Sequence, residues 1–484
     1  MKIIAIDIPL GIVKSLDIPW YFNKLLSEKR KDIIKDNFVD KFQILLPPSQ
    51  TYTLGLLSVI TALSVNGHTV KYMHFEDTSE FFGELSCLVM DYDMVLFSCK
   101  TTTYNTALRL CGHIKSLKPN IISVFGGVHI TALPESVISE KEVDYIVIGE
   151  GEISLLTILD KIESGSEIER VNGIGYKDTK GNIIINKKFD LINNISQLPT
   201  VLYEDFLGDL NMYHNYVETS RGCCYECSFC GNPLLWKKKI RCFSADKTYK
   251  LLQTLSTKLH PNTLVHLVDP SYGNSNEMEL LCEMLVQKPL NIYFSCDINI
   301  IQVNERRIKK MYSAGVRMFC IGIESMCDNI LNFNKKPQTS KKVIEACEII
   351  RATSDSFIKS YWIVGLPGEN ENSAKRSRDY AVEMLNKNLI DLVCEHVFVA
   401  YPGCDVYTNL GEYNFVIEHH NWDNYDSRSF PLPGESKNFS MEQVLIAYLD
   451  FLRAQCEYYG LSDRDSLRKN VSEYTFTKFK GGMI

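Results

Sequence analysis

The sequence lacks the features that would place it in a membrane, outside the cell or on nucleic acid. It contains no run of about eighteen apolar residues, so a membrane-spanning helix is not expected. Its first residues lack the long apolar core of a signal peptide, which predicts a cytoplasmic protein. Lys and Arg number 52 against 59 Asp and Glu, and this net charge of −7 gives no sign of nucleic-acid binding. We therefore expect a small molecule or a peptide as the substrate.

Long polar tracts are also absent, and Gly and Pro are scattered, so no segment is expected to be a disordered tether. The 484 residues, 45% of them hydrophobic, predict about two to four folded domains. The 16 cysteines are expected to stay reduced without an export signal, which makes a close group of them a candidate metal site. Others fall in helical apolar patterns and are expected in the core: Cys87, Cys111, Cys282 and Cys347.

The first part of the chain alternates short β-branched runs with amphipathic helical patterns. Strands are predicted at Ile3–Asp7, Val70–His74, Met94–Ser98, Ile121–Phe125 and Tyr145–Ile148. Helices are predicted at Leu54–Asn66, Tyr104–Leu117 and Glu152–Glu163. This βα alternation predicts a Rossmann-like domain over residues 1–168, in which ligands bind at the carboxyl ends of the strands.

A hairpin with its turn at Asp178–Gly181 and a linker are predicted over residues 169–214. A second βα series then covers residues 215–402. Its strands are predicted at Tyr216–Thr219, Val265–Val268, Ile292–Cys296, Met318–Gly322, Ile358–Val364 and Val393–Val399. This series predicts an incomplete (β/α)6 TIM-type barrel, so the whole chain is of the α/β class. Residues 403–484 are predicted to be mainly helical, with a helix at Met441–Tyr459 capped by Ser440 and Gln443 and ended by Gly460.

Three cysteines, Cys223, Cys227 and Cys230, directly follow the first predicted barrel strand. Thiolates are soft, charged ligands that suit iron–sulfur clusters. Three ligands for the four irons of a cubane leave one iron open to a further cofactor. Structural zinc is the alternative, but it needs a fourth ligand. Cys224 is poorly placed to be that ligand, and no CxxC partner follows.

This cysteine spacing, with Phe229 before the last cysteine, resembles the signature of the radical S-adenosylmethionine (SAM) superfamily, and the resemblance implies Phe229 as a SAM contact. The resemblance implies a [4Fe-4S] cluster that cleaves SAM to a 5′-deoxyadenosyl radical, with electrons from an external one-electron reductant. The segment Gly322-Ile-Glu-Ser resembles the one whose acid, here Glu324, contacts SAM. The segment Val364-Gly-Leu-Pro-Gly-Glu, with Gly365 and Pro367, resembles the one beside the adenine, and Tyr401-Pro-Gly resembles the turn after the sixth strand. Singly, each of these segments is equally typical of an ordinary strand-end turn.

Two acids extend the predicted SAM site with weaker support. Asp269-Pro-Ser-Tyr keeps only an acid and an aromatic of the run found in related chains, and Asp269 is a candidate partner of the SAM amino group. Asp297, after the third predicted barrel strand, occupies a comparable position. Both acids have a plain alternative as helix N-caps.

The N-terminal domain resembles the cobalamin-binding domain that precedes the barrel in one branch of the superfamily. The resemblance rests on Gly126-Gly-Val-His, Ile148-Gly-Glu-Gly-Glu and Leu54-Gly-Leu-Leu-Ser. It implies a cobalamin site formed by Tyr52, Leu54, Gly55, Ser98, Thr102, Gly126, Gly127, His129, Gly149, Glu150 and Gly151. Tyr52 lies where related domains carry the histidine that coordinates cobalt, so the lower face of the cobalt is expected to lack a His ligand. The alternative is a generic Rossmann domain with tight turns.

Together these resemblances imply a cobalamin-dependent radical SAM methyltransferase that methylates an unactivated carbon. Two alternatives stay open: a cyclisation or rearrangement on the same scaffold, and a non-catalytic cobalamin or redox sensor. The aromatic-rich stretch Tyr413–Phe430, with His419, His420 and Trp422, is a candidate lid or else a packed surface loop. Cys404 is a candidate participant near the pocket mouth, although core packing fits it better. No residue beyond the cofactor contacts is assigned to catalysis, and no motif identifies the substrate.

Overall fold

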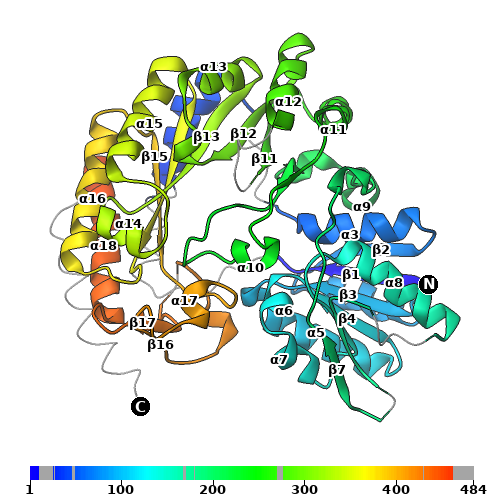
Figure 1. The fold of residues 1–484 in the computed structure, drawn as a ribbon. Coiled ribbons are helices and arrows are strands. Elements are labelled where there is room, and N and C mark those ends of the chain that lie inside the picture. Colours follow the sequence, from blue (N-terminus) through cyan, green and yellow to red (C-terminus); the bar gives the residue numbers. More distant parts are fainter. Residues whose placement is uncertain are drawn as a thin grey trace.

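The computed structural model describes residues 1–9, 26, 28–45, 50–166, 171–178, 180–269, 276–428 and 430–461. Two α/β units lie side by side, and the C-terminal elements lie along the second unit (Figure 1). No helix within these residues is long and apolar enough to cross a membrane.

The first unit is built on a seven-stranded sheet in the order β2-β1-β3-β4-β5-β6-β7. Its parallel strands are β1 (Lys2–Asp7), β2 (Thr69–His74), β3 (Met94–Ser98), β4 (Ile122–Gly126) and β5 (Tyr145–Val147). These bounds agree with the predicted strands to within one residue. The predicted Rossmann-like class is thereby confirmed.

Helices cover both faces of this sheet because successive strand residues point to opposite sides. Ile3 and Ala5 of β1 join the core under α3 (Leu54–Val65) and α8 (Gly151–Ser164). Ile4 and Ile6 join the core on the other face. The helices of that other face are α4 (Ser79–Val89), α5 (Tyr104–Leu117), α6 (Val128–Ala132) and α7 (Pro134–Ser139).

The hairpin that the sequence places in the connecting segment belongs to the first sheet. Its strands are β6 (Ile174–Lys177) and β7 (Ile183–Asn186), and β6 pairs antiparallel with β5. The sheet therefore continues to residue 186. Short elements complete the connection: η3 (Ile195–Gln197), α9 (Tyr203–Leu207) and η4 (Leu210–Met212).

The second unit is a six-stranded parallel sheet in the order β15-β14-β13-β12-β11-β8, which is the predicted incomplete barrel. Its strands are β8 (Tyr216–Glu218), β11 (Thr263–Val268), β12 (Ile292–Ile298), β13 (Val316–Glu324), β14 (Phe357–Val364) and β15 (Leu392–Val397). Its helices are α11 (Ala245–Lys258), α12 (Asn276–Gln287), α13 (Glu305–Ser313), α14 (Asp328–Phe333), α15 (Ser340–Thr353) and α16 (Glu371–Asn386). These helices lie outside the curved sheet (Figure 1).

An early segment of the chain closes the amino end of this barrel, which the sequence did not indicate. Leu45 pairs with Thr263, and the preceding η1 (Lys35–Val39) and α2 (Asp40–Phe42) form an apolar layer with inner strand residues. In that layer the Phe38 and Phe357 rings are 5.3 Å apart.

The C-terminal region combines α17 (Asp405–Thr408), an antiparallel pair β16 (Phe415–Ile417) and β17 (Gly434–Ser436), and α18 (Met441–Tyr458). The Ser440 and Gln443 capping box of α18 is present as predicted. The stretch predicted as lid or packed loop reaches the first unit through η6 (Trp422–Asn424), where the Trp422 ring is 4.9 Å from that of His129. Cys404 is fully buried in an apolar cluster, in agreement with core packing.

Candidate functional site

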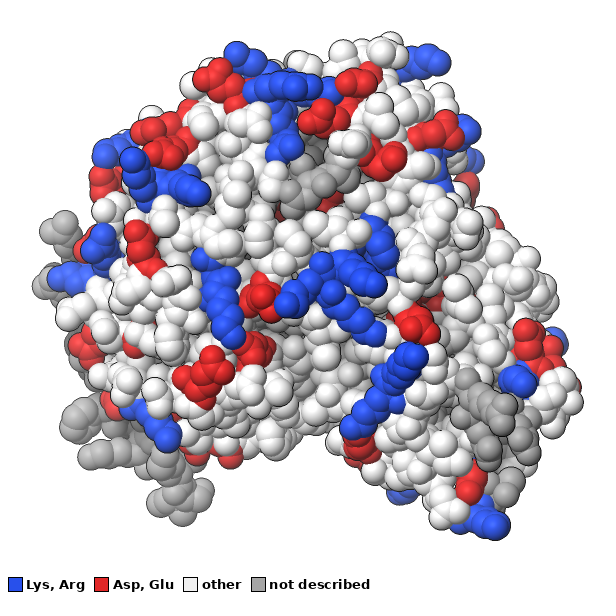
Figure 2. Space-filling view, in the orientation of Figure 1, with Lys and Arg blue, Asp and Glu red and all other residues white. Residues whose placement is uncertain are grey.

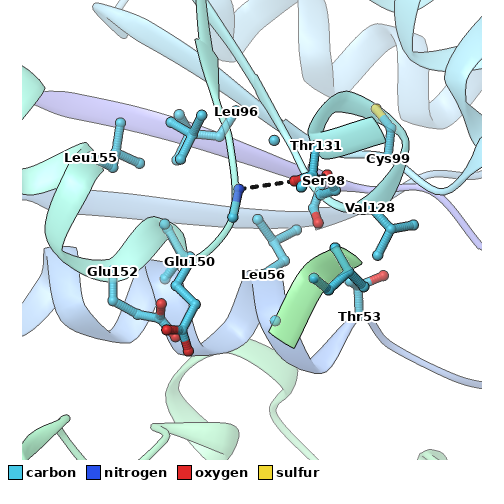
Figure 3. Close-up of a pocket in the computed structure, with 18 of the residues that line it drawn as sticks. Thr53, Leu56, Leu96, Ser98, Cys99, Val128, Thr131, Glu150, Glu152 and Leu155 are labelled. Atoms are coloured by element: carbon cyan, nitrogen blue, oxygen red, sulfur yellow. Dashed lines mark hydrogen bonds between the residues drawn. The ribbon is translucent and has the colours of Figure 1, made fainter. Parts of the chain in front are cut away.

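A cavity of about 280 Å³ opens at the carboxyl ends of β3, β4 and β5 (Figure 3). The first unit supplies most of its wall, from the start of α3 and the turns Ser98–Lys100, Gly126–Val128 and Gly149–Glu152. The second unit supplies four residues: Glu218, Arg221, Leu235 and Trp236. These come from β8, β9 (Ser220–Arg221) and α10 (Asn232–Trp236). The cavity therefore lies between the two units.

Along this wall, glycines leave the backbone uncovered by side chains. A Cβ atom at Gly55 would have no heavy atom within 4 Å, and one at Gly126 would be 3.8 Å from Val147. Gly127 has a φ of 100°, which side chains rarely adopt, and a Cβ there would lie 2.7 Å from Cys99 O. Such a wall fits a flat ligand like the corrin edge or nucleotide tail of cobalamin, because the ligand can approach the backbone closely.

Thr131 holds two of these strand-end turns together. Its hydroxyl donates to Gly127 O at 2.9 Å and accepts from Gly149 N at 2.9 Å. The second of these bonds is drawn in Figure 3. The shape of the wall is thereby set by a side chain that the sequence did not single out.

Seven of the eleven residues predicted for cobalamin line the cavity: Gly55, Ser98, Gly126, Gly127, Gly149, Glu150 and Gly151. The other four are not among its lining residues: Tyr52, Leu54, Thr102 and His129.

The side chains of Tyr52 and His129 make contacts outside the cavity. The Tyr52 hydroxyl accepts from Tyr216 N at 2.8 Å, which ties α3's entry to the first barrel strand. His129 is buried 4.3 Å from the ring of Tyr104, and burial lowers its pKa to about 4. No histidine lies among the described residues that line the cavity.

The cysteine loop, residues 222–231, joins β9 to α10. Cys223, Cys227 and Cys230 are half-buried, whereas Cys224 is exposed. Burial raises the pKa of all three thiols, and at Cys227, where the pKa is about 12, Cys230 and Cys223 add to this effect. The three sulfur atoms are thus neighbours, and Cys224 beside them is exposed to solvent.

Within the described ranges, no group of three or more Cys, His, Asp or Glu side chains is arranged to hold a metal ion. The assignment of a cluster to Cys223, Cys227 and Cys230 stays a prediction that rests on their spacing in the sequence.

Asn334 fastens the cysteine loop to the segment after β14. Its backbone and side-chain oxygens accept from Ser228 N at 3.0 Å and Ser228 Oγ at 2.9 Å. Its Nδ2 donates to Pro367 O at 2.8 Å, and the side chain is fully buried. Asn334 thereby aligns the predicted cluster ligands with the predicted adenine segment.

Lys336 joins two of the predicted SAM contacts at the cysteine loop, and a third lies near Cys223. Its Nζ pairs with Glu324 Oε1 at 3.0 Å and lies 5.9 Å from the centre of the Phe229 ring. Asp269 is buried at the end of β11, close enough to Cys223 to raise the pKa of its thiol. Residues 270–272 of the predicted acidic-aromatic run lie outside the described residues. Lys336 was missed because a lone lysine in a loop carries no motif.

The remaining predicted SAM contacts, Gly365 and Pro367, lie in a turn closed by Glu369. Gly365 has a φ of 90°, and its N–H donates to Glu369 Oε2 at 2.7 Å. Burial raises the pKa of Glu369 to about 8, against the backbone hydrogen bonds from Gly365 and Leu366. This carboxyl is therefore largely protonated at neutral pH.

A buried ion network joins the two units at the rim of the cavity. Arg221, directly before the cysteine loop, donates to Glu150 Oε1 and Glu152 Oε1, both at 2.7 Å. It also pairs with Glu218 Oε2 at 3.0 Å. Arg241, from β10 (Arg241–Cys242), adds a second cation at 2.6 Å from Glu150 Oε2. We call these five residues the interdomain ion network.

The interdomain ion network is almost closed to water, since the Arg221 and Glu152 side chains are each 4% exposed. Burial alone would raise the pKa of Glu152, but Arg221 and a hydrogen bond from Ser58 hold it below its usual value. Figure 3 shows the carboxylates of Glu150 and Glu152 side by side. Both oxygens of Glu150, which the sequence predicts as a cobalamin contact, are taken by arginines.

Charged side chains on the outer surface are less regularly arranged than those of the interdomain ion network. Acidic and basic side chains are mixed on the face in Figure 2, with Lys and Arg gathered near the place of α10 in Figure 1. Three lysines, residues 237–239, directly follow α10.

Two protein families match successive parts of the chain. The B12 binding domain matches residues 44–159, which include α3 and the cavity wall of the first unit. The Radical SAM superfamily matches residues 217–381, which include the cysteine loop and the barrel strands β11 to β14.

The individual relatives have low sequence identity to this chain, but their alignments cover most of its length. An uncharacterized methyltransferase of Pyrococcus horikoshii is 25% identical over 84% of this chain and 90% of its own length. An anaerobic magnesium-protoporphyrin IX monomethyl ester cyclase of Rubrivivax gelatinosus is 23% identical over 67% of this chain and 61% of its own. A radical S-adenosylmethionine methyltransferase, TsrM, of Kitasatospora setae has the same fold, with a TM-score of 0.67 and 12% identity over 96% of this chain and 89% of its own.

Replacing the central arginine of the interdomain ion network should be costly. Arg221→Ala leaves three carboxylates short of their cation, and breaking a buried ion pair typically costs about 3–5 kcal/mol. We expect a large fall in the apparent Tm measured by scanning calorimetry. Arg109→Ala is the matched control, because that exposed arginine reaches Asp423 only at 4.0 Å. Equal Tm values for the two variants would contradict the assigned role of the network.

Glu369 should make stability depend on pH. Its pKa is near 4.5 when unfolded and about 8 when folded, so this contribution is complete below pH 4.5 and is lost as pH rises to about 8. Glu369→Gln removes it, so the Tm of the variant relative to the wild type should increase between pH 5 and 8 and then level off. The limit is roughly 5 kcal/mol. The exposed Glu371→Gln should show no such trend, and a flat difference for Glu369→Gln would exclude the buried neutral carboxyl.

Proposed function

Because this chain belongs to the radical SAM superfamily and carries a B12 binding domain ahead of its barrel, we propose that it is a cobalamin-dependent methyltransferase acting on an unactivated carbon. The observation that carries the proposal is the position of the strand-end cavity. Its wall includes Arg221 and Trp236, which flank the cysteine loop on both sides. A cofactor in the cavity would thus be a neighbour of a cluster on the loop.

The residues of the chain divide the work. Cys223, Cys227 and Cys230 would hold the cluster, Glu324 and the Gly365–Pro367 turn would hold SAM, and the strand-end glycines would hold cobalamin. When bound, the cluster with SAM supplies a 5′-deoxyadenosyl radical and cobalamin supplies the methyl group. The Lys336–Glu324 pair keeps a cation beside anionic groups in a site with little water. The proposal also includes an external one-electron reductant that supplies the electrons, and it places the protein in the cytoplasm.

A ring-closing reaction on the same scaffold is the second candidate, favoured by the resemblance to the cyclase of Rubrivivax gelatinosus. Incubation with methyl-labelled SAM separates the two, because the label enters the product only in methylation.

The cluster assignment predicts different outcomes for two thiols of the cysteine loop. Cys227→Ala should lose most of its iron after anaerobic reconstitution and form no 5′-deoxyadenosine with SAM and a reductant. Cys224→Ala removes an exposed neighbouring thiol and should keep both. Iron retained by Cys227→Ala, or zinc bound by the wild type in place of iron, would refute the assignment.

Filling the cavity should displace cobalamin without harming the fold. Gly55 lines the cavity with open space around its Cβ position, so Gly55→Leu should fold normally and bind at least about tenfold less cobalamin. Gly83→Leu is the matched control, because Gly83 also lies in a helix with no heavy atom within 4 Å but outside the lining residues. Cobalt content and the cobalamin absorption spectrum report the result. Equal loading of both variants would remove the cavity from the proposal.

A further inference from the structure

The inner face of the barrel is polar above its closed amino end. Side chains alternate across a strand, and Cys296, Ile298, Ile358 and Trp362 belong to the core under the outer helices. Their neighbours Asp297, Lys359 and Tyr361 therefore face the barrel interior. We call the inward set the polar band: Tyr216, His266, Asp297, Lys359, Tyr361 and His396.

The polar band has an apolar floor. Leu264, Met318, Phe357 and Leu392 lie nearer the amino ends of the barrel strands, and they belong to one apolar cluster with Phe38. Within the described residues, this apolar cluster covers the amino end below the polar side chains. They are partly exposed, and the Asp297 side chain is 48% exposed, so they are reached from the carboxyl end, where the cysteine loop lies.

The polar band holds one positive and one negative charge. Burial lowers the pKa of His396 to about 4, so this imidazole is neutral at pH 7. Asp297 Oδ2 is 3.2 Å from His266 Nε2, which leaves Oδ1 available. Lys359 Nζ lies 5.1 Å from the centre of the Tyr361 ring and makes no ion pair with any carboxylate of the described ranges.

A half-buried ammonium without a carboxylate partner is free to pair with a carboxylate that a ligand supplies. Asp297 pairs in register with Cys320, and Cys320 pairs with Lys359. The two charges therefore stand two strand spacings apart, roughly 10 Å between backbones. A simple anion would be attracted by Lys359 and repelled by Asp297. A molecule with one carboxylate and one ammonium group satisfies both.

We propose that the polar band binds the substrate and that the substrate is a zwitterion of the amino-acid class. Its carboxylate pairs with Lys359, and its amino group donates to Asp297. Its side chain then points away from the floor, toward the cysteine loop. This inference rests on the proposed function, which supplies the reaction at that end of the barrel.

The test uses reconstituted holoenzyme and a defined set of probes. The probes are the proteinogenic L-amino acids, their carboxamides, which lack the carboxylate, and their N-acetyl derivatives, which lack the ammonium. Binding is measured by equilibrium dialysis in the presence of SAM. We expect at least one amino acid to bind the wild type at least about tenfold more tightly than either derivative.

Substitutions locate the site. Lys359→Gln should weaken that amino acid about tenfold or more, and Lys359→Arg should restore most of the affinity because it keeps the cation. Asp297→Asn should reduce discrimination against the N-acetyl derivative. Lys341→Gln, a lysine with an 85% exposed side chain, should bind like the wild type. The Tm and iron content of each variant show whether it folds.

Three outcomes would overturn the inference: no amino acid binds, the carboxamides bind equally well, or folded Lys359→Gln keeps wild-type affinity. Formation of 5′-deoxyadenosine by the same wild-type preparation tests the proposed function separately. If the radical product forms and amino acids do not bind, only the substrate class fails.

Discussion

The guanidinium of Arg221 holds together two α/β units that each have their own sheet. Three carboxylates surround it where little water enters, and a second arginine shares one of them. Neither unit can move away without leaving buried charge unpaired, and such charge is far more costly inside a protein than in water. Because Arg221 is followed by Gly222 and Cys223, the same contact sets where the cysteine loop begins.

This constraint explains how separate sites come to share one place. The carboxyl ends of the parallel strands carry the ligand-binding turns in both kinds of sheet. Here those of the first unit form the cavity, and those of the second carry the cysteine loop and the Glu369 turn. The ion network brings the two edges together, while Asn334 joins the two segments of the barrel edge. Residues more than two hundred positions apart in the sequence thus contribute groups to the region where the two strand edges meet.

The sequence predicted the strands well because strands depend on local patterns, and the cysteine motif is local in the same way. Period-two alternation and β-branched runs locate strands such as β3, and the cysteine spacing is contained within eight residues. Contacts between distant residues leave no such local pattern. Arg30 and Glu395 pair across 365 positions, and Arg221 and Glu152 across 69. A motif also does not tell which way a side chain turns, which is why Tyr52 and His129 lie away from the cavity.

Within the described residues, the apolar layer formed by Phe38 and its neighbours covers the amino end of the barrel, so molecules reach the interior from the carboxyl end. Anything that lies deep in the interior has to arrive before the molecules that sit above it, and it leaves after they have gone. Steady-state kinetics would therefore show a compulsory sequence of arrival, with the deeper molecule first and SAM second. The short η1 and α2 elements, far in sequence from every cysteine of the loop, would then decide the kinetic scheme of the enzyme.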